Sequence, residues 1–169
     1  GKNSSYTQKS SRFKAMDENE YRTTYHGLNT QRCVFEKAIL ILNCNCRLHE
    51  KFNLAEREGI RCNDRKAQQN CSIFLNESRA KAQFALRLTE IVGNLLPHSK
   101  EIRVQKGALL GLQPDLPNLS DTEIIDIYSL IEKALDVSNG DIKQYPYEKL
   151  IASISHHPAR PKRTRKRKK

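Results

Sequence analysis

The sequence has no tryptophan, only one methionine, and no apolar run approaching the ~20 residues that a bilayer-spanning helix needs. Residues 1–5 lack the apolar core of a secretory signal peptide, so we expect a soluble intracellular protein of the cytoplasm, nucleoid or nucleus. The P-loop, the dinucleotide-binding glycine motif, the HExxH zinc motif and the GxSxG nucleophile motif are also missing. These absences predict a protein that is not an enzyme.

The composition divides the chain into three parts. Residues 1–25 are polar and lack apolar periodicity, which predicts a flexible N-terminal arm. Residues 26–157 have an ordinary apolar content and are long enough for a single helical domain. Residues 158–169 are a basic C-terminal tail.

Apolar spacings of three and four residues predict two long helices. The first is expected from residue 29 or 30 to at least Asn43, and the second from a cap at Asn63 or Asp64 to the stop at Pro97. An antiparallel hairpin of these two helices would form the centre of an irregular bundle. The predicted fold class is therefore all-α.

The second half of the domain is less regular. Alternating polar and apolar residues at 101–105 indicate a short strand, and Gly107 and Gly111 indicate a loop after it. A third helix is predicted from the capping box at 120–123 to just before Gly140. A fourth is expected at 147–154, next to Pro146.

Four of the five cysteines fall within 28 residues, in the pattern C-x-C-x15-C-x8-C. Four thiols so close together in an intracellular chain predict a zinc or iron–sulfur site formed by Cys44, Cys46, Cys62 and Cys71. Cys33 is excluded from this set, because on a continuous helix it would lie about 16 Å from Cys44 along the axis. The predicted ligands meet at the turn end of the helical hairpin.

Other interpretations of the cysteines stay open. The spacing matches neither the usual zinc pairs nor the ferredoxin patterns, so the thiols could also be small buried apolar groups. Cys62 lies between Arg61 and Arg65, which favours a lowered pKa and a redox switch. His49 could replace one thiolate in a metal site, although an exposed histidine at such a position is more often simply a surface residue.

The tail contains eight basic residues and no acid, whereas the other 157 residues carry 22 basic and 19 acidic side chains. Such a block binds the phosphate backbone of DNA or RNA by charge and carries little sequence information. A nuclear localisation signal and a solubilising tail are alternatives, and a membrane surface is disfavoured because no lipid anchor accompanies the charges. The predicted nucleic-acid-binding residues are Arg160, Lys162, Arg163, Arg165, Lys166, Arg167, Lys168 and Lys169.

These patterns together predict a nucleic-acid-associated regulator or ribonucleoprotein component with a Cys-ligated metal centre. The alternative is a protein–protein adaptor or assembly subunit. Its second helix would bind a protein partner, its cysteines would be structural, and its basic tail would serve solubility or targeting.

Overall fold

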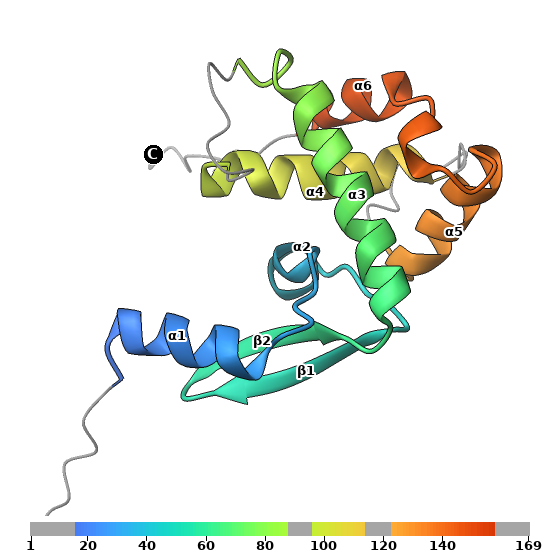
Figure 1. Cartoon of the computed structure of the whole chain (residues 1–169). Coiled ribbons are helices and arrows are strands. Elements are labelled where there is room, and N and C mark those ends of the chain that lie inside the picture. The colour runs from blue at the N-terminus through green and yellow to red at the C-terminus, as the bar shows by residue number, and fades with distance from the viewer. Residues whose placement is uncertain (1–15, 88–95, 114–122, 158–169) are drawn as a thin grey trace, which may run out of the picture.

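The computed structural model describes residues 16–87, 96–113 and 123–157. Within these ranges the chain forms helices and one two-stranded antiparallel sheet (Figure 1). In chain order the elements are α1 (Glu18–Leu28), α2 (Glu36–Ile41), β1 (His49–Leu54), β2 (Arg57–Cys62), α3 (Arg65–Ala82), α4 (His98–Leu112), α5 (Ile127–Val137), the 3-10 helix η1 (Ile142–Gln144) and α6 (Glu148–His156).

The prediction of an all-α fold is wrong, because residues 49–62 form a β-hairpin. Phe52 and Leu54 on β1 have the two-residue spacing of one strand face, and so do Ile60 and Cys62 on β2. Because Phe52 pairs with Gly59 and not with Ile60, the two pairs of residues lie on opposite faces of the hairpin. Leu54 pairs with Arg57, which leaves a two-residue turn with Ala55 at a φ of 55°. The turn lacks the Asn-Gly or Asp-Gly pair that usually marks such a hairpin in a sequence.

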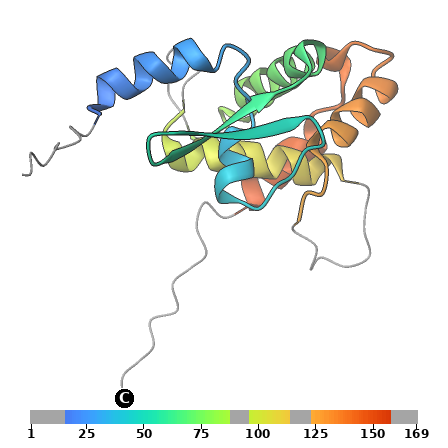
Figure 2. The same cartoon turned by 90° about the horizontal axis from the view of Figure 1, so that it is seen from below.

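The predicted first helix is much shorter than expected. Within this stretch only Glu36–Ile41 is α-helical, Arg32 forms a β-bridge with Arg61, and residues 34–35 form a turn. The Cys33 N–H donates to the Ile60 carbonyl at 3.0 Å, and the Cys62 N–H donates to the Gln31 carbonyl at 2.9 Å. Residues 31–33 therefore lie alongside β2. Seen from below, the hairpin lies in front of the helical part (Figure 2), and β2 contacts both α2 and α3.

The second predicted helix is present as α3, and its predicted cap is confirmed. Asp64 precedes the helix, and its carboxylate accepts the Ala67 N–H at 2.8 Å. The helix ends at Ala82, and residues 88–95 of the predicted 32-residue helix lie outside the described residues. The described ranges therefore show no long antiparallel helix hairpin. The core side of α3 is formed by Ala67, Cys71, Phe74, Leu75, Ser78 and Ala82.

The strand and loop predicted at 101–111 are instead part of α4. Both glycines of this stretch allow α6 to pack closely on α4, which is the most extensive helix contact of the fold (Figure 1). A Cβ atom on Gly107 would lie 2.6 Å from the Ile154 Cα, and one on Gly111 would lie 2.6 Å from the Leu150 Cδ2. The glycines thus mark a close helix crossing and not a turn.

The C-terminal helices agree better with the sequence. The predicted third helix corresponds to α5, which ends before Gly140, and that glycine has a φ of +85°. The predicted helix at 147–154 corresponds to α6 (Glu148–His156). Residues 120–122 of the predicted capping box lie outside the described residues, and Asp126 is the N-cap of α5.

The first part of α1 lies in the segment expected to be a flexible arm, residues 1–25. Asp17 caps this helix by accepting the Glu20 N–H at 2.8 Å. Tyr25 is buried and stacks on Phe52 of β1, so α1 packs on the hairpin.

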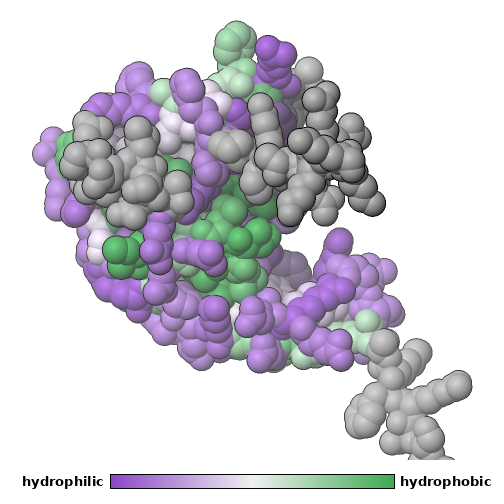
Figure 3. Space-filling model, turned by 180° about the vertical axis from the view of Figure 1, so that it is seen from behind, coloured by the Kyte–Doolittle hydropathy of each residue, from purple (hydrophilic) through white to green (hydrophobic). Residues whose placement is uncertain are grey.

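Hydrophilic side chains cover most of the face seen from behind, and apolar side chains gather in one hollow of that face (Figure 3). No helix within the described ranges has both the length and the apolar character needed to span a lipid bilayer.

Candidate functional site

Four of the five cysteines line one small cavity between the hairpin and α3. The cavity has a volume of about 20 Å³, and its sulfur-bearing walls are Cys33, Cys46, Cys62 and Cys71. The remaining walls are mostly apolar and include Leu48 and Ile127. All five cysteines of the chain are free thiols. A shared cavity with four thiols is the strongest concentration of chemically reactive groups in the described ranges.

Backbone pairing brings these cysteines together from four segments of the chain. Cys33 lies beside β2, and Cys62 ends that strand. Cys46 begins a turn in which its carbonyl accepts the His49 N–H at 3.2 Å, and this turn leads into β1. Cys71 is on the buried side of α3, which starts three residues after β2 ends.

Cys44 does not line this cavity, contrary to its predicted convergence with the other three. Its Sγ lies 3.6 Å from the Lys106 Nζ of α4, and both residues are buried. Its backbone forms a bridge with Ile124. Cys33 lies at the cavity where Cys44 was expected, because residues 31–33 pair with β2 and the continuous helix assumed for Cys33 does not form.

Burial governs the ionisation of the four thiols. It raises the pKa of Cys33 from 9.0 to about 12, and it raises the pKa values of Cys46, Cys62 and Cys71 as well. Charges on Cys33, Cys46 and Cys62 would raise the pKa of Cys71 further, so the four thiols are within electrostatic range of one another. In the absence of a metal ion the cavity therefore holds neutral thiols at neutral pH.

These pKa values predict that the metal-free protein loses stability at alkaline pH. The pKa of Cys33 is higher in the folded protein than in the unfolded chain, so its stabilising contribution is complete below pH 9.0 and is lost as pH rises toward about 12. We expect the urea midpoint to fall across this window. In Cys71→Ala the fall should be shallower, since one buried thiol with a raised pKa is gone. If the urea midpoint fell equally steeply with pH in Cys71→Ala and in the natural protein, this explanation would be contradicted.

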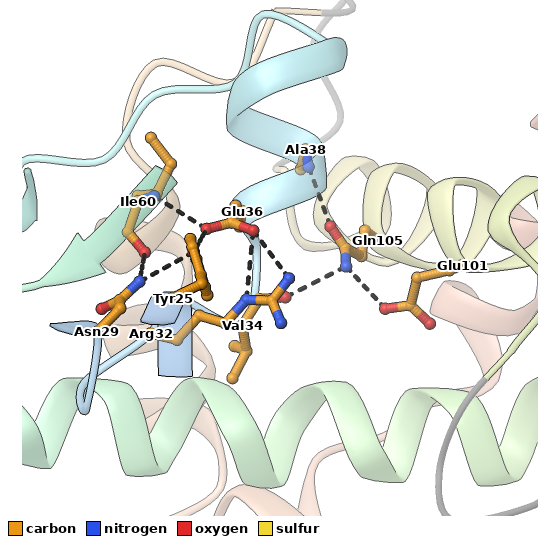
Figure 4. Close-up of polar contacts among 9 residues, drawn as sticks. All are labelled: Tyr25, Asn29, Arg32, Val34, Glu36, Ala38, Ile60, Glu101 and Gln105. Carbon is orange, nitrogen blue, oxygen red and sulfur yellow. Dashed lines mark hydrogen bonds and ion pairs between the residues drawn. The ribbon is translucent and has the colours of Figure 1, made fainter. Parts of the chain in front are cut away.

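A buried carboxylate fixes the segment that carries Cys33. Glu36 accepts hydrogen bonds from the Ile60 N–H at 2.9 Å and from the Tyr25 hydroxyl, and it forms an ion pair with Arg32 at 2.8 Å (Figure 4). The amide of Asn29 donates to the Ile60 carbonyl at 3.0 Å. These bonds join α1, β2 and the start of α2 on both sides of Cys33.

Gln105 of α4 holds the same segment from the other side (Figure 4). Its carbonyl oxygen accepts the Ala38 N–H at 3.0 Å, and its amide donates to the Val34 carbonyl at 3.2 Å and to Glu101 at 2.7 Å. Gln105 is buried away from water, so its amide group depends on these hydrogen bonds within the protein. The residues that flank Cys33 are thus held by polar groups that periodicity alone could not identify.

A larger cavity of about 310 Å³ adjoins the cysteine cavity. The two cavities share Cys33, Val34 and Gln68 as wall residues. The larger cavity is also lined by the ion pairs of Arg32 with Glu36 and of Arg79 with Glu101, and by Lys37, which adds a positive charge to its wall. Cys33 is only half-buried and is the thiol that lies between the two spaces.

The thiols do not form a ready-made cage for an ion. Within the three described ranges no three His, Cys, Asp or Glu side chains are close enough together to bind a metal ion without rearrangement. The thiols line common walls, and their side chains would have to turn inward to share an ion. A cysteine needs only a change of its χ1 rotamer for this.

The other predicted site residues fall outside the cavity. The Nδ1 of His49 contacts the Cys46 carbonyl oxygen, and His49 is not a wall residue. Burial raises the pKa of Cys62, so the lowered pKa expected beside Arg61 and Arg65 is not seen. The eight basic residues of the tail lie outside the described residues.

Comparisons of this chain with protein-family models, with curated proteins and with solved structures found no match. Its function must therefore be inferred from its own residues and their geometry.

Proposed function

We propose that the protein is a non-enzymatic, nucleic-acid-associated regulator or ribonucleoprotein component. In this proposal residues 158–169 bind the phosphate backbone of DNA or RNA, and the folded part holds a Cys-ligated zinc ion or iron–sulfur cluster. The observation that carries the proposal is the segregation of charge. The tail has eight basic residues and no acid, whereas the rest of the chain is close to neutral, with 22 basic and 19 acidic residues.

The position of the tail in the chain supports this function. It follows α6 directly, and α6 packs on α4. Arg103 of α4 donates to the carbonyl of Ile154 at 2.8 Å and to that of Ser155, which holds the last turn of α6. The basic run therefore starts from a fixed end of the folded part, where a bound phosphate backbone would be kept close to the protein.

The free thiols support an intracellular location for this activity. All five cysteines are unpaired, and reducing compartments are where thiols persist without forming disulfides.

The adaptor alternative has less support. It requires an apolar stripe of α3 that a protein partner can reach. In α3 the apolar side is buried in the core, with Phe74 and Leu75 fully covered, whereas Phe84 after its end is exposed and residues 88–95 of the predicted helix lie outside the described residues.

Nucleic-acid binding is expected to depend steeply on salt and on the tail. If all eight basic residues contact phosphates, log K should fall with log salt concentration with a slope of about −7 on duplex DNA. Fluorescence anisotropy with labelled random-sequence duplex and RNA, at several salt concentrations, measures this slope. A chain that ends at His157 should lose most of its affinity. Unchanged affinity after this truncation would overturn the proposal.

Two tail variants separate charge from sequence. A scrambled 158–169 segment of the same composition should bind as well as the natural one, because phosphate contacts carry no sequence information. A segment with every Lys and Arg replaced by Gln should behave like the truncated chain. A large loss on scrambling would instead indicate that a receptor reads the segment as a targeting signal.

A further inference from the structure

Four thiols from four different segments converge on one cavity of about 20 Å³. The space is about the size of one water molecule, and its lining exposes no polar surface apart from sulfur. Two of the four cysteines, Cys46 and Cys62, adjoin polar residues in the sequence and are nevertheless buried at this cavity.

We propose that Cys33, Cys46, Cys62 and Cys71 are the four ligands of one thiophilic metal centre, and that Cys44 is not a ligand. This inference deepens the metal part of the proposed function, because it names the donor set and the chemistry of the centre. Cys33 enters the set because residues 31–33 pair with β2. Cys44 leaves it because its thiol lies against Lys106 of α4.

The donor set fits a soft metal. Zinc and iron–sulfur clusters both accept four thiolates, and hard cations such as magnesium or calcium need oxygen ligands that this cavity does not offer. Both thiophilic centres share the same protein chemistry. Each cysteine loses a proton, and each thiolate forms one bond to a metal atom of the centre. A single zinc ion would bind all four sulfurs at about 2.3 Å, whereas a cluster would take one sulfur at each iron or two at each.

A tetrathiolate centre needs nearby positive charge. Four thiolates on one divalent ion carry a net charge of −2, which is costly to bury without nearby cations. Lys37 lines the adjoining 310 Å³ cavity, which shares Cys33 as a wall residue, whereas Arg32 of the same wall forms an ion pair with Glu36. The Lys37 charge would offset part of the charge of the centre.

The test uses the full chain, reduced and handled without oxygen. One portion is titrated with Co²⁺, whose tetrathiolate complexes are coloured, and then with competing Zn²⁺. A second portion is incubated with ferric iron, sulfide and excess dithiol, which reduces as much of the iron as the cluster requires. We expect either one zinc per chain or a brown protein with iron and sulfide in equal amounts. The two arms distinguish the two sources of metal, and binding in either one supports the site.

Single Cys→Ser variants identify the ligands. Stoichiometric metal binding should be lost in each of the four ligand variants, Cys33→Ser, Cys46→Ser, Cys62→Ser and Cys71→Ser. The control variant Cys44→Ser should keep one metal centre per chain. Cys33 is the most informative position, because its half-buried side chain allows the variant to fold. Circular dichroism of each metal-free variant checks this. Should the buried Cys71→Ser variant unfold, the contrast between Cys33→Ser and Cys44→Ser still decides the result.

Three outcomes would overturn the inference. These are no stoichiometric metal in either arm, full binding by Cys33→Ser, and loss of binding by Cys44→Ser. Nucleic-acid affinity is measured separately on the same preparations. A chain that binds no metal in either arm but binds DNA through its tail would contradict only this inference. A metal-loaded chain without DNA affinity would contradict only the nucleic-acid proposal.

Discussion

Glu36→Ala is expected to destabilise the folded protein by about 3 kcal/mol. The substitution removes the acceptor of the Ile60 N–H and of the buried Tyr25 hydroxyl, and it breaks the ion pair with Arg32. Leaving buried donors without partners costs more than the bonds themselves contribute. Arg32 is half-exposed, so water can solvate its freed charge, and most of the loss comes from the other two groups. Urea unfolding, followed by circular dichroism, measures the change.

Two further variants make this result specific. Glu18→Ala removes an exposed carboxylate that pairs with Arg22 and Arg57, and we expect it to leave the urea midpoint nearly unchanged because exposed ion pairs contribute little. Glu36→Gln keeps an acceptor oxygen but not the charge, so its stability should lie between those of the natural protein and Glu36→Ala. Equal midpoints for Glu36→Ala and the natural protein would show that the buried carboxylate is not needed to join α1, α2 and β2.

The hairpin shows why the fold class could not be read from the sequence. Phe52 and Leu54 alternate with polar residues, and so do Ile60 and Cys62 across the turn, which is a signal for two short strands. The turn between them contains Ala55 and Glu56, and neither residue favours a positive φ. Without Gly or Asn at this position, the same stretch is also compatible with a continuation of the first predicted helix beyond Asn43. The structure shows strands there instead.

The prediction of the cysteine site was affected by the same assignment of a continuous first helix. Three of the four thiols at the cavity, Cys46, Cys62 and Cys71, were predicted from spacing alone to lie together. The fourth depended on whether residues 31–35 are helical, because a helix separates Cys33 from the others and an extended segment does not. Local apolar periodicity cannot decide this. The extended path is fixed by long-range bonds from Ile60, Gln105 and Glu36, which have no local signature in the sequence.

The glycines of α4 were also ambiguous in the sequence. Gly107 and Gly111 are four residues apart, a spacing that puts both on one face of a helix. Glycine is equally common in loops, and the alternation at 101–105 favoured a strand that ends at such a loop. Close packing of α6 on that face decided the outcome, and only tertiary contacts could reveal it.

Gly107→Val is expected to destabilise the protein by about 3 kcal/mol. A Cβ atom at this position would lie 2.6 Å from the Cα of Ile154 and 3.0 Å from its backbone nitrogen. Both atoms belong to the α6 backbone, so no side-chain rotation can relieve the clash, and the two helices must move apart. Because α4 and α6 form the most extensive helix contact of the fold, this separation also loosens the helix that leads into the basic tail. Thermal and urea unfolding measure the effect.

The matched control is Gly27→Val in α1, where a Cβ atom would meet nothing within 4 Å. Valine has a higher helix propensity than glycine, so this variant should be as stable as the natural protein or slightly more so, by less than about 0.5 kcal/mol. The same chemical change should thus have opposite consequences at two helical positions. If Gly107→Val were as stable as Gly27→Val, α6 would not lie against this face of α4. Gly107 would then be simply a weak helix former, and its presence would be unrelated to helix packing.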